Sequence, residues 1–312
     1  MKILFRKYLV LFVKVIANIN ISIWALKRIT LIEWKINVNN RFNKIFLLNK
    51  PFPYVARFNT KKIPIERLKS FYFIDDFQMM LNVAEFTQCD YFFGNIDLTL
   101  IQLLKEGGDV FVDIGANVGL YSLLSAQTFN KVVSFEPSSA NFSKLNSNVK
   151  LNNYQDKISC YEVAISNTNA VKNLYNNPLN SGGSSLSSFT GSNMFDSYPE
   201  YNWDFAEVET KTLDHFLLNV KGSIDFIKID IEGFELEAII GAKKIIAKHN
   251  SIIYAEVSSS YLTVKKILAE LPPSYIAYSA LNNQELKSNS FIPQDVLFIN
   301  KNIKKKMDVN AK

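Results

Sequence analysis

The fold of this chain follows from Val110-Phe111-Val112-Asp113-Ile114-Gly115-Ala116-Asn117-Val118-Gly119-Leu120-Tyr121. The segment begins as an apolar run with β-branched residues and passes through a turn that contains two glycines; Leu120, Leu123 and Leu124 then recur at helical spacing. This order predicts a strand, a tight turn and a helix. In α/β sheets, nucleotide-like ligands bind at the carboxyl end of such a strand.

The spacing of the glycines indicates which ligand the turn suits. A dinucleotide-binding turn has the pattern Gly-x-Gly-x-x-Gly, whereas Gly115 and Gly119 are separated by three residues and Asn117 stands where the second glycine would be. Asp113 precedes the turn, and a carboxylate there favours a cationic or amine-bearing ligand over a pyrophosphate. The turn therefore favours S-adenosylmethionine over NAD. The alternative is that the glycines only ease packing.

A carboxylate after a second buried strand supports the same ligand. Val132-Val133-Ser134-Phe135 reads as the strand, and Glu136 and Pro137 follow it. Glu136 lies 23 residues after Asp113, and a Rossmann-like fold places the acid that binds the ribose hydroxyls about 20 residues beyond the glycine turn. Pro137 suits the entrance of the next helix. On its own, Glu136 would equally fit a solvated strand end.

Five motifs, in this order, resemble the FkbM family of S-adenosylmethionine-dependent methyltransferases. The resemblance covers roughly residues 85–260 and is carried by Asp113-Ile-Gly115-Ala-Asn117-Val-Gly119, Phe135-Glu136-Pro137, Gly183-Ser184-Ser185-Leu186, Thr212-Leu213-Asp214 and Lys228-Ile229-Asp230-Ile231-Glu232-Gly233. It implies S-adenosylmethionine as the cofactor and an oxygen atom as the methyl acceptor, often a hydroxyl of a sugar or natural product. It also implies that Ala164, at the end of the third predicted strand, lies near the adenine ring.

The predicted fold is α/β, a Rossmann-like class I methyltransferase sheet with helices on both faces and an N-terminal apolar helical extension. We expect the methyltransferase domain at 95–300, an apolar helix at 1–34, an accessory or lid segment at 35–94 and a basic, frayed tail at 301–312. Within the domain, the patterns predict helices at 95–105, 138–151 and 261–271 and strands at 110–114, 132–136, 157–165, 208–212, 224–230, 251–257, 275–278 and 296–299.

The composition narrows the class of protein. The 312 residues are 48% hydrophobic, enough for one large domain with a smaller attachment. Much of the formal net charge of +6 comes from the two ends, and no continuous basic stripe interleaves with the aromatics, so we expect no nucleic-acid partner. Cys89 and Cys160 lack metal or redox spacing and fit a reducing cytosol. Two histidines argue against a histidine-rich zinc site.

The first 34 residues are unusually apolar and admit three structures. Lys14, Asn18 and Asn20 interrupt the run that a membrane span would need, and no clean Ala-x-Ala site supports a signal peptide. Polar residues recur at helical spacing on a wide apolar helix, which favours an amphipathic helix at a membrane surface. Packing on the domain or on a partner subunit, and a true span, are the alternatives. The basic tail could meet anionic lipid together with this helix or only aid solubility.

The segment 176–207 reads as a long irregular insertion. It contains Asn180-Ser-Gly-Gly-Ser-Ser-Leu-Ser-Ser188 and several aromatic residues. A long loop inside a compact domain is more often functional than idle, so we expect a lid that faces the substrate. A flexible linker is the alternative. For Asp214, after the short strand that follows, we expect an N-cap of its own helix.

The fourth strand carries the candidate catalytic residues Asp230, Lys228 and Glu232. In this architecture the first and fourth strands are neighbours, so Asp230 should lie beside the ligand bound at the glycine turn. Asp230 is the first candidate for the base or for the group that positions the acceptor. Strand alternation puts Lys228 on the same face, where it could pair with Asp230 or orient the acceptor. The alternative is that Asp230 and Glu232 only cap the next helix. A divalent metal on Asp230 and Glu256 is conceivable, but we predict none.

The sequence thus predicts methyl transfer from S-adenosylmethionine to a hydroxyl, on a saccharide, glycolipid or polysaccharide precursor. N-methylation of an aminosugar or small amine is the alternative within enzymes, and a non-catalytic, membrane-associated cofactor-binding protein is the alternative outside them. The expected location is the cytoplasm, at the cytoplasmic face of a membrane if the N-terminal helix binds there. The acceptor and the oligomeric state do not follow from the sequence.

Overall fold

The computed structural model describes residues 54–58, 77–81, 87–88, 91, 97–176, 181–186, 205–257, 261–287 and 294–304. The predictions for the apolar helix at 1–34, for most of the segment 35–94 and for the tail beyond residue 304 lie outside these residues. Within the predicted domain at 95–300, residues 95–96, 177–180, 187–204, 258–260 and 288–293 lie outside the described part of the chain.

A seven-stranded sheet forms the centre of the molecule, in the order β11-β12-β10-β9-β3-β4-β5. Its strands are β3 (Gly108–Ile114), β4 (Phe129–Phe135), β5 (Ile158–Tyr161), β9 (Ile224–Ile229), β10 (Ile252–Glu256), β11 (Tyr275–Ser279) and β12 (Asp295–Asn300). Within this sheet β12 runs antiparallel to both of its neighbours, and the other pairs are parallel. The strand order changes direction between β3 and β9, which makes their carboxyl ends the switch point where ligands bind.

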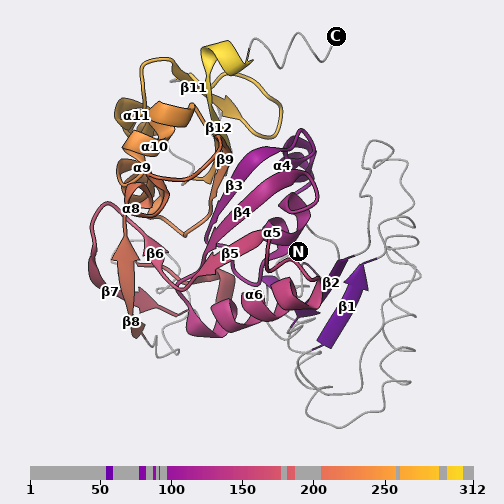
Figure 1. The fold of residues 1–312 in the computed structure, drawn as a ribbon. Helices are drawn as coiled ribbons and strands as arrows, with labels where there is room; N and C mark the ends of the chain where they lie inside the picture. The colour runs from indigo at the N-terminus through magenta and orange to yellow at the C-terminus, as the bar shows by residue number, and fades with distance from the viewer. Residues whose placement is uncertain are drawn as a thin grey trace, which may run out of the picture.

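Helices cover both faces of the sheet, as predicted (Figure 1). One face carries α4 (Leu98–Leu104), α5 (Leu120–Ser125) and α6 (Ser139–Leu151), and the other carries α8 (Leu213–Leu217), α9 (Glu235–Ile240), α10 (Lys243–His249) and α11 (Tyr261–Glu270). Alternate residues of β3 serve the two cores: Val110 and Val112 pack with the α8–α11 side, and Phe111 packs with the α4–α6 side. The strand is therefore apolar on both faces, as expected for a strand buried between two helical layers.

The predicted strand 157–165 is wrong as one element, because the chain changes sheets within it. β5 ends at Tyr161, and β6 (Ala164–Ile165) pairs instead with β8 (Phe205–Lys211), which also pairs with β7 (Ala170–Tyr175). These three strands form a separate small sheet. A continuous apolar pattern shows that residues are extended, but it does not show which strand they pair with.

Two further strands, β1 (Tyr54–Phe58) and β2 (Phe77–Leu81), form an antiparallel pair. The Asn152 side chain, after α6, accepts a hydrogen bond from the Gln78 amide (2.7 Å) and donates one to the Gln78 carbonyl (2.6 Å). Side-chain amides thus satisfy backbone groups at the edge of β2 and attach this pair to α6.

The prediction that Asp214 caps its own helix is wrong. The N-cap of α8 is Thr212, whose side chain accepts from the His215 amide. Asp214 instead accepts from the amides of Lys244 (3.2 Å) and Ile245 (2.9 Å), at the start of α10. The Asp214 carboxylate therefore satisfies the amino end of a different helix, which packs beside its own.

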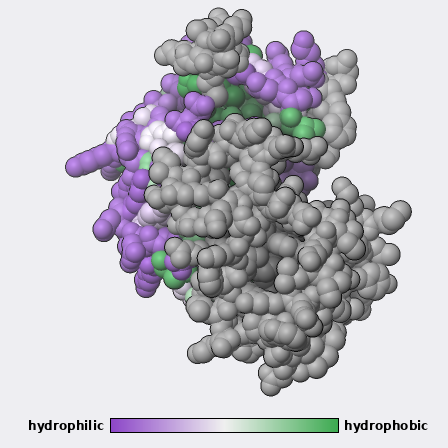
Figure 2. Space-filling view, turned by 90° about the vertical axis from the view of Figure 1, so that its right-hand side faces the viewer, coloured by the Kyte–Doolittle hydropathy of each residue, from purple (hydrophilic) through white to green (hydrophobic). Residues whose placement is uncertain are grey.

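The start of the basic tail is ordered as a helical turn at residues 301–304 rather than frayed. Lys304 is 9% exposed and its ammonium lies 5.4 Å from the centre of the Tyr278 ring. On the face drawn in Figure 2, the described surface is mainly hydrophilic, with smaller hydrophobic patches. Among the described residues, no helix combines the length and the apolar character that crossing a membrane requires.

Candidate active site

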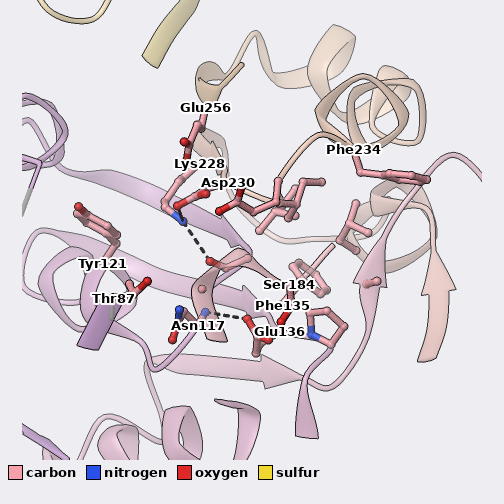
Figure 3. A pocket seen from close by; sticks show the side chains of 18 of the residues that line it. Thr87, Asn117, Tyr121, Phe135, Glu136, Ser184, Lys228, Asp230, Phe234 and Glu256 are labelled. Carbon is pink, nitrogen blue, oxygen red and sulfur yellow. Dashed lines mark hydrogen bonds and ion pairs between the residues drawn. The ribbon is translucent and has the colours of Figure 1, made fainter. Parts of the chain in front are cut away.

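A cavity of about 590 Å³ opens at the carboxyl ends of β3, β4, β9 and β10. Its walls come from the β3–α5 turn, from the residues after β4 and β9, and from the segment 181–186 (Figure 3). These elements meet at the switch point of the sheet. The cavity is therefore where the fold predicts a ligand.

The turn after β3 needs a glycine at position 115. Gly115 has a φ of +77°, and a Cβ added to it would lie 1.9 Å from the carbonyl oxygen of Asp230. The amides of Gly115 and Ala116 both donate to the Phe135 carbonyl (3.0 Å each). The turn is thus wedged between the ends of β4 and β9, where no side chain fits.

Glu136 lies directly beside this turn. Its Oε2 accepts from the Asn117 amide (2.8 Å) and its Oε1 from the Ser138 amide (3.0 Å). Burial raises the pKa of Glu136 to about 7, against the opposing effect of these two amides. Asn117 has a φ of +52°, and its Oδ1 is buried without a hydrogen-bond partner among the described residues. A buried acceptor of this kind takes a donor from water or from a bound molecule.

An apolar wall continues from Glu136 away from the turn. It is formed by Pro137 together with Val163, Ala164, Ile165, Leu174 and Leu186. Three of these residues come from the point where the chain leaves the central sheet for the small one. A flat aromatic base can rest on such a wall, while the neighbouring carboxylate holds a pair of hydroxyls.

Lys228 lines the cavity beside Asp230 (Figure 3), and its ammonium is shared among three acceptors. The nitrogen is 3.1 Å from the Gly115 carbonyl oxygen, 3.3 Å from Asp113 Oδ1 and 3.5 Å from Asp230 Oδ2. Burial alone would lower the pKa of Lys228, but the carboxylates of Asp113 and Asp230 outweigh it and raise the pKa. Lys228 therefore stays protonated.

Four further carboxylates surround Asp230 at this end of the cavity: Asp97, Glu232, Glu256 and Asp295. Burial raises the pKa values of Glu232 and Asp295 to about 7. Burial and a hydrogen bond with Asp230 raise the pKa of Glu256 far above its usual range. Glu256 also accepts a hydrogen bond from Gln294. Not all of these groups can be ionised together in a cavity without a ligand.

Most of the predicted site residues line this cavity: Gly115, Asn117, Glu136, Pro137, Ala164, Lys228, Asp230 and Glu232. Asp113 and Gly119 do not. The Asp113 side chain has no exposed surface, and it accepts from the Ser122 hydroxyl (2.6 Å) and pairs with Lys228. Gly119 begins α5 with a φ of +94°, and a Cβ there would lie 2.6 Å from a Leu145 methyl group. Both residues position the turn and the helix from behind the cavity, and their contact with the cofactor stays a prediction.

The sequence analysis missed several residues of the cavity, among them Asp97, Tyr121, Tyr254 and Asp295. Asp97 is the N-cap of α4 and accepts from the Tyr254 hydroxyl. Asp295 begins β12, directly opposite Glu256 in the register of the sheet. An antiparallel strand begins at the edge where its parallel neighbours end. This rule predicts Asp295 at the site once the last strand is known to be antiparallel, but the sequence pattern does not give the direction of that strand.

The segment 181–186 lies against the cavity. Gly182, Ser184 and Leu186 line it, and the Ser185 hydroxyl donates to the Glu232 carbonyl oxygen (2.7 Å). A Cβ on Gly182 would meet Thr87 Oγ1 at 2.4 Å. This part of the insertion is thus packed on the site. Its role as a substrate-facing lid stays a prediction, since residues 187–204 lie outside the described part of the chain.

In the parts of the chain that the structure describes, no three His, Cys, Asp or Glu side chains are grouped as a metal ion would require. The idea of a divalent metal on Asp230 and Glu256 therefore receives no support from the geometry.

The site can be compared with known proteins. The model of the Methyltransferase FkbM domain matches residues 113–279, which is more than half of the chain. The chain belongs to the FkbM methyltransferase family. This family assignment confirms the predicted family, the methyltransferase activity of the domain and S-adenosylmethionine as its cofactor. None of the curated proteins compared with the sequence matches it.

Solved structures resemble the fold at low sequence identity. Methyltransferase FkbM from Methylobacillus flagellatus KT is 18% identical, with a TM-score of 0.42 over 69% of this chain. This chain spans about half of that protein's length, 51%. An O-methyltransferase from Bacillus cereus in complex with SAH is 13% identical, with a TM-score of 0.34 over 65% of this chain and 79% of the other. An rRNA methylase from Streptococcus thermophilus is 13% identical, with a TM-score of 0.35 over 65% of this chain and 92% of the other. Likenesses of this size carry no information about the acceptor.

Proposed function

We propose that this protein transfers a methyl group from S-adenosylmethionine to a hydroxyl of a saccharide, glycolipid or polysaccharide precursor. The observation that carries the proposal is the position of Asp230. Its carboxylate lines the cavity at the end of β9, beside the glycine turn and 3.5 Å from the Lys228 ammonium. A hydroxyl acceptor needs such a group for alignment and for loss of its proton.

The other end of the cavity fits the cofactor. Glu136 offers carboxylate oxygens to the two ribose hydroxyls, and the wall around Ala164 offers an apolar face to the adenine ring. The backbone of the turn from Gly115 to Asn117 comes close to the cavity without intervening side chains. Asn117 Oδ1 remains available to accept from a ligand donor. This division leaves the carboxylate-rich end for the acceptor.

The cofactor, held by the turn and by Glu136, would supply a methyl group on a sulfonium. The acceptor oxygen would take that methyl group in line, with the sulfur leaving as a thioether that keeps the electron pair of the S–C bond. The proton of the hydroxyl passes to the Asp230 carboxylate. Lys228 forms an ion pair with Asp230, and the Glu256 carboxyl hydrogen-bonds to it. These two contacts fix the orientation of the Asp230 carboxylate. A positioned carboxylate contributes on the order of 10²–10⁴-fold as a general base.

The cellular setting is part of the same proposal. The enzyme works in the cytoplasm, and the apolar N-terminal segment together with the basic tail brings it to the cytoplasmic face of a membrane. A lipid-linked glycan would be presented at that surface. The support is the composition of the two ends, an apolar segment of 34 residues and a cluster of lysines.

The test is transfer of labelled methyl from S-adenosylmethionine into lysate fractions of lipid-linked glycan, free polysaccharide, protein, nucleic acid and small molecules. The full chain is compared with Asp230→Asn, and Asp156→Asn, an exposed acid in the loop before β5, is the matched control. Label in a glycan fraction that falls at least 100-fold in Asp230→Asn is the expected result. Label confined to protein or nucleic acid would overturn the proposed acceptor.

A further inference from the structure

The acceptor end of the cavity carries far more negative than positive charge. Asp97, Asp230, Glu232, Glu256 and Asp295 line it, and among the described lining residues Lys228 is the one cation. That ammonium is already shared between Asp230 and the fully buried Asp113. We call these five acids the carboxylate cluster. Its charge is not balanced within the described part of the protein.

The sheet explains why the carboxylate cluster forms. Asp230 and Glu232 follow β9, and Glu256 ends the neighbouring parallel strand β10. Asp295 begins the antiparallel β12 and is the cross-strand partner of Glu256. Asp97, at the amino end of α4, joins them through its hydrogen bond with Tyr254 of β10. Acids on four segments are thus brought to one edge of the sheet, although they are far apart in the sequence.

Hydrogen bonds hold these carboxylates in place. Asp97 Oδ1 accepts from the amides of Thr99 (2.8 Å) and Leu100 (3.1 Å), and Glu256 accepts from Gln294. A carboxylate has about four acceptor sites, so these partners orient each group and leave capacity for a ligand. At the cofactor end, Asn117, 8% exposed, adds an acceptor oxygen that has no partner among the described residues. Carboxylates therefore outnumber positive charges along the described lining of the cavity.

A buried, oriented set of acids is stabilised by a cation or by protons. A metal ion is disfavoured, because no group of three or more metal-binding side chains exists among the described residues. A primary ammonium has three N–H donors, and two carboxylates together with one neutral oxygen acceptor are enough to satisfy it. Resting on the function proposed above, we propose that the acceptor carries a primary ammonium group, which binds the carboxylate cluster through Asp295 and Glu256 and presents a neighbouring hydroxyl to Asp230. An amino sugar has this arrangement.

The positive charge of the bound ammonium group decides which atom of the acceptor receives the methyl group. A protonated amine held by carboxylates has no free electron pair, so it cannot attack the methyl carbon. The hydroxyl keeps its electron pairs and lies at Asp230. The amine therefore serves recognition, and the reaction is O-methylation of an amine-bearing acceptor rather than N-methylation.

The test compares three sugars that differ at one position: glucosamine with an amine, glucose with a hydroxyl, and N-acetylglucosamine with a neutral amide. Binding of each is measured by ligand-observed NMR titration to the full chain saturated with S-adenosylhomocysteine. We expect glucosamine to bind at least ten-fold more tightly than the other two. Asp295→Asn should abolish this preference, and Asp156→Asn should keep it. Glu256→Gln is the second variant, if Asp295→Asn does not fold.

Three results would overturn the inference. The first is that glucosamine binds no better than its neutral counterparts at any concentration. The second is that its preference survives both Asp295→Asn and Glu256→Gln. The third is competition between glucosamine and S-adenosylhomocysteine, which would assign the carboxylate cluster to the cofactor's own ammonium. Binding of S-adenosylhomocysteine is measured by calorimetry, and methyl transfer to the glycan fraction is measured separately. Loss of these two activities would mean that the proposed function fails, whereas loss of the glucosamine preference alone would mean that amine recognition fails.

Discussion

Replacing Lys228 by methionine tests the electrostatic arrangement at the centre of the site. Methionine keeps much of the volume of the lysine stem but removes the ammonium. Asp113, which has no exposed surface, then keeps the Ser122 hydroxyl as a partner but loses the positive charge at 3.3 Å. Breaking a buried pair by removing one partner costs about 3–5 kcal/mol. We therefore expect Lys228→Met to lower the free energy of unfolding by about 4 kcal/mol.

The assay is urea denaturation followed by tryptophan fluorescence and circular dichroism. With a slope of about 2–3 kcal/mol per molar urea, a loss of about 4 kcal/mol lowers the midpoint by roughly 1.3–2 M. The exposed Lys265 of α11 provides the control, since Lys265→Met should stay within about 0.5 kcal/mol of the wild type. The control separates loss of this particular charge from loss of any lysine.

A second variant tests whether the stability lost in Lys228→Met comes from the unpaired charge of Asp113. Asp113→Asn combined with Lys228→Met removes both charges and leaves polar groups that Ser122 can still contact. The double variant should be at least about 2 kcal/mol more stable than Lys228→Met alone, because no uncompensated charge remains. A double variant no more stable than Lys228→Met, or a loss below about 1 kcal/mol in Lys228→Met itself, would refute the reasoning.

Three further predictions concern the turn, the ribose-binding acid and a helix cap. Gly115→Ala should unfold the domain or lower the free energy of unfolding by more than about 3 kcal/mol in urea melts, because the new Cβ would lie 1.9 Å from the Asp230 carbonyl oxygen. The control is Gly233→Ala, at a φ of +100° with no atom within 4 Å of the added Cβ, which should lower it by only about 1–2 kcal/mol. Equal losses in the two variants would contradict the clash. Burial raises the pKa of Glu136 from 4.5 to about 7. The contribution of Glu136 to the free energy of unfolding is therefore complete below about pH 4.5 and is lost as the pH rises through 7, so over this range the wild type should lose up to about 3 kcal/mol relative to Glu136→Gln. Parallel pH profiles of the two proteins in urea melts would show that the acid is not buried. Asp214→Ala removes the acceptor for two amides at the start of α10 and should lower the free energy of unfolding by about 1 kcal/mol, whereas an unchanged urea midpoint would rule out the cap.

Sequence reasoning located the glycine turn, Glu136 and Asp230 because each follows an apolar strand. Apolar runs bounded by glycine or an acid mark strand ends, and strand ends in a parallel sheet lie at one edge. The meeting of Gly115 with Asp230 followed from the expected adjacency of the first and fourth strands. The structure agrees: β3 and β9 are paired, and the Asp230 amide donates to the Ile114 carbonyl at 3.1 Å.

The partners of the charged residues were not predictable in the same way. Strand alternation placed Lys228 and Asp230 on one face, but it does not give the register between β3 and β9. In that register Asp113 is the cross-strand partner of Lys228, and the two side chains form an ion pair that the sequence analysis did not predict. Asp214 shows the same limit, since its position before a helix predicts a cap but not which helix it caps.

Lys228 links the two ends of the cavity through one buried charge. Its ammonium accepts no hydrogen bonds, and its donors are committed to the Gly115 carbonyl, to Asp113 and to Asp230. The first two contacts fix the turn that borders the cofactor end, and the third orients the carboxylate at the acceptor end. A double variant of Asp113 and Lys228 that regains stability therefore still lacks the cation beside Asp230. This double variant should recover folding without recovering methyl transfer. The Asp113–Lys228 pair stabilises the sheet, whereas the ammonium, together with Glu256, orients the carboxylate that we propose as the base.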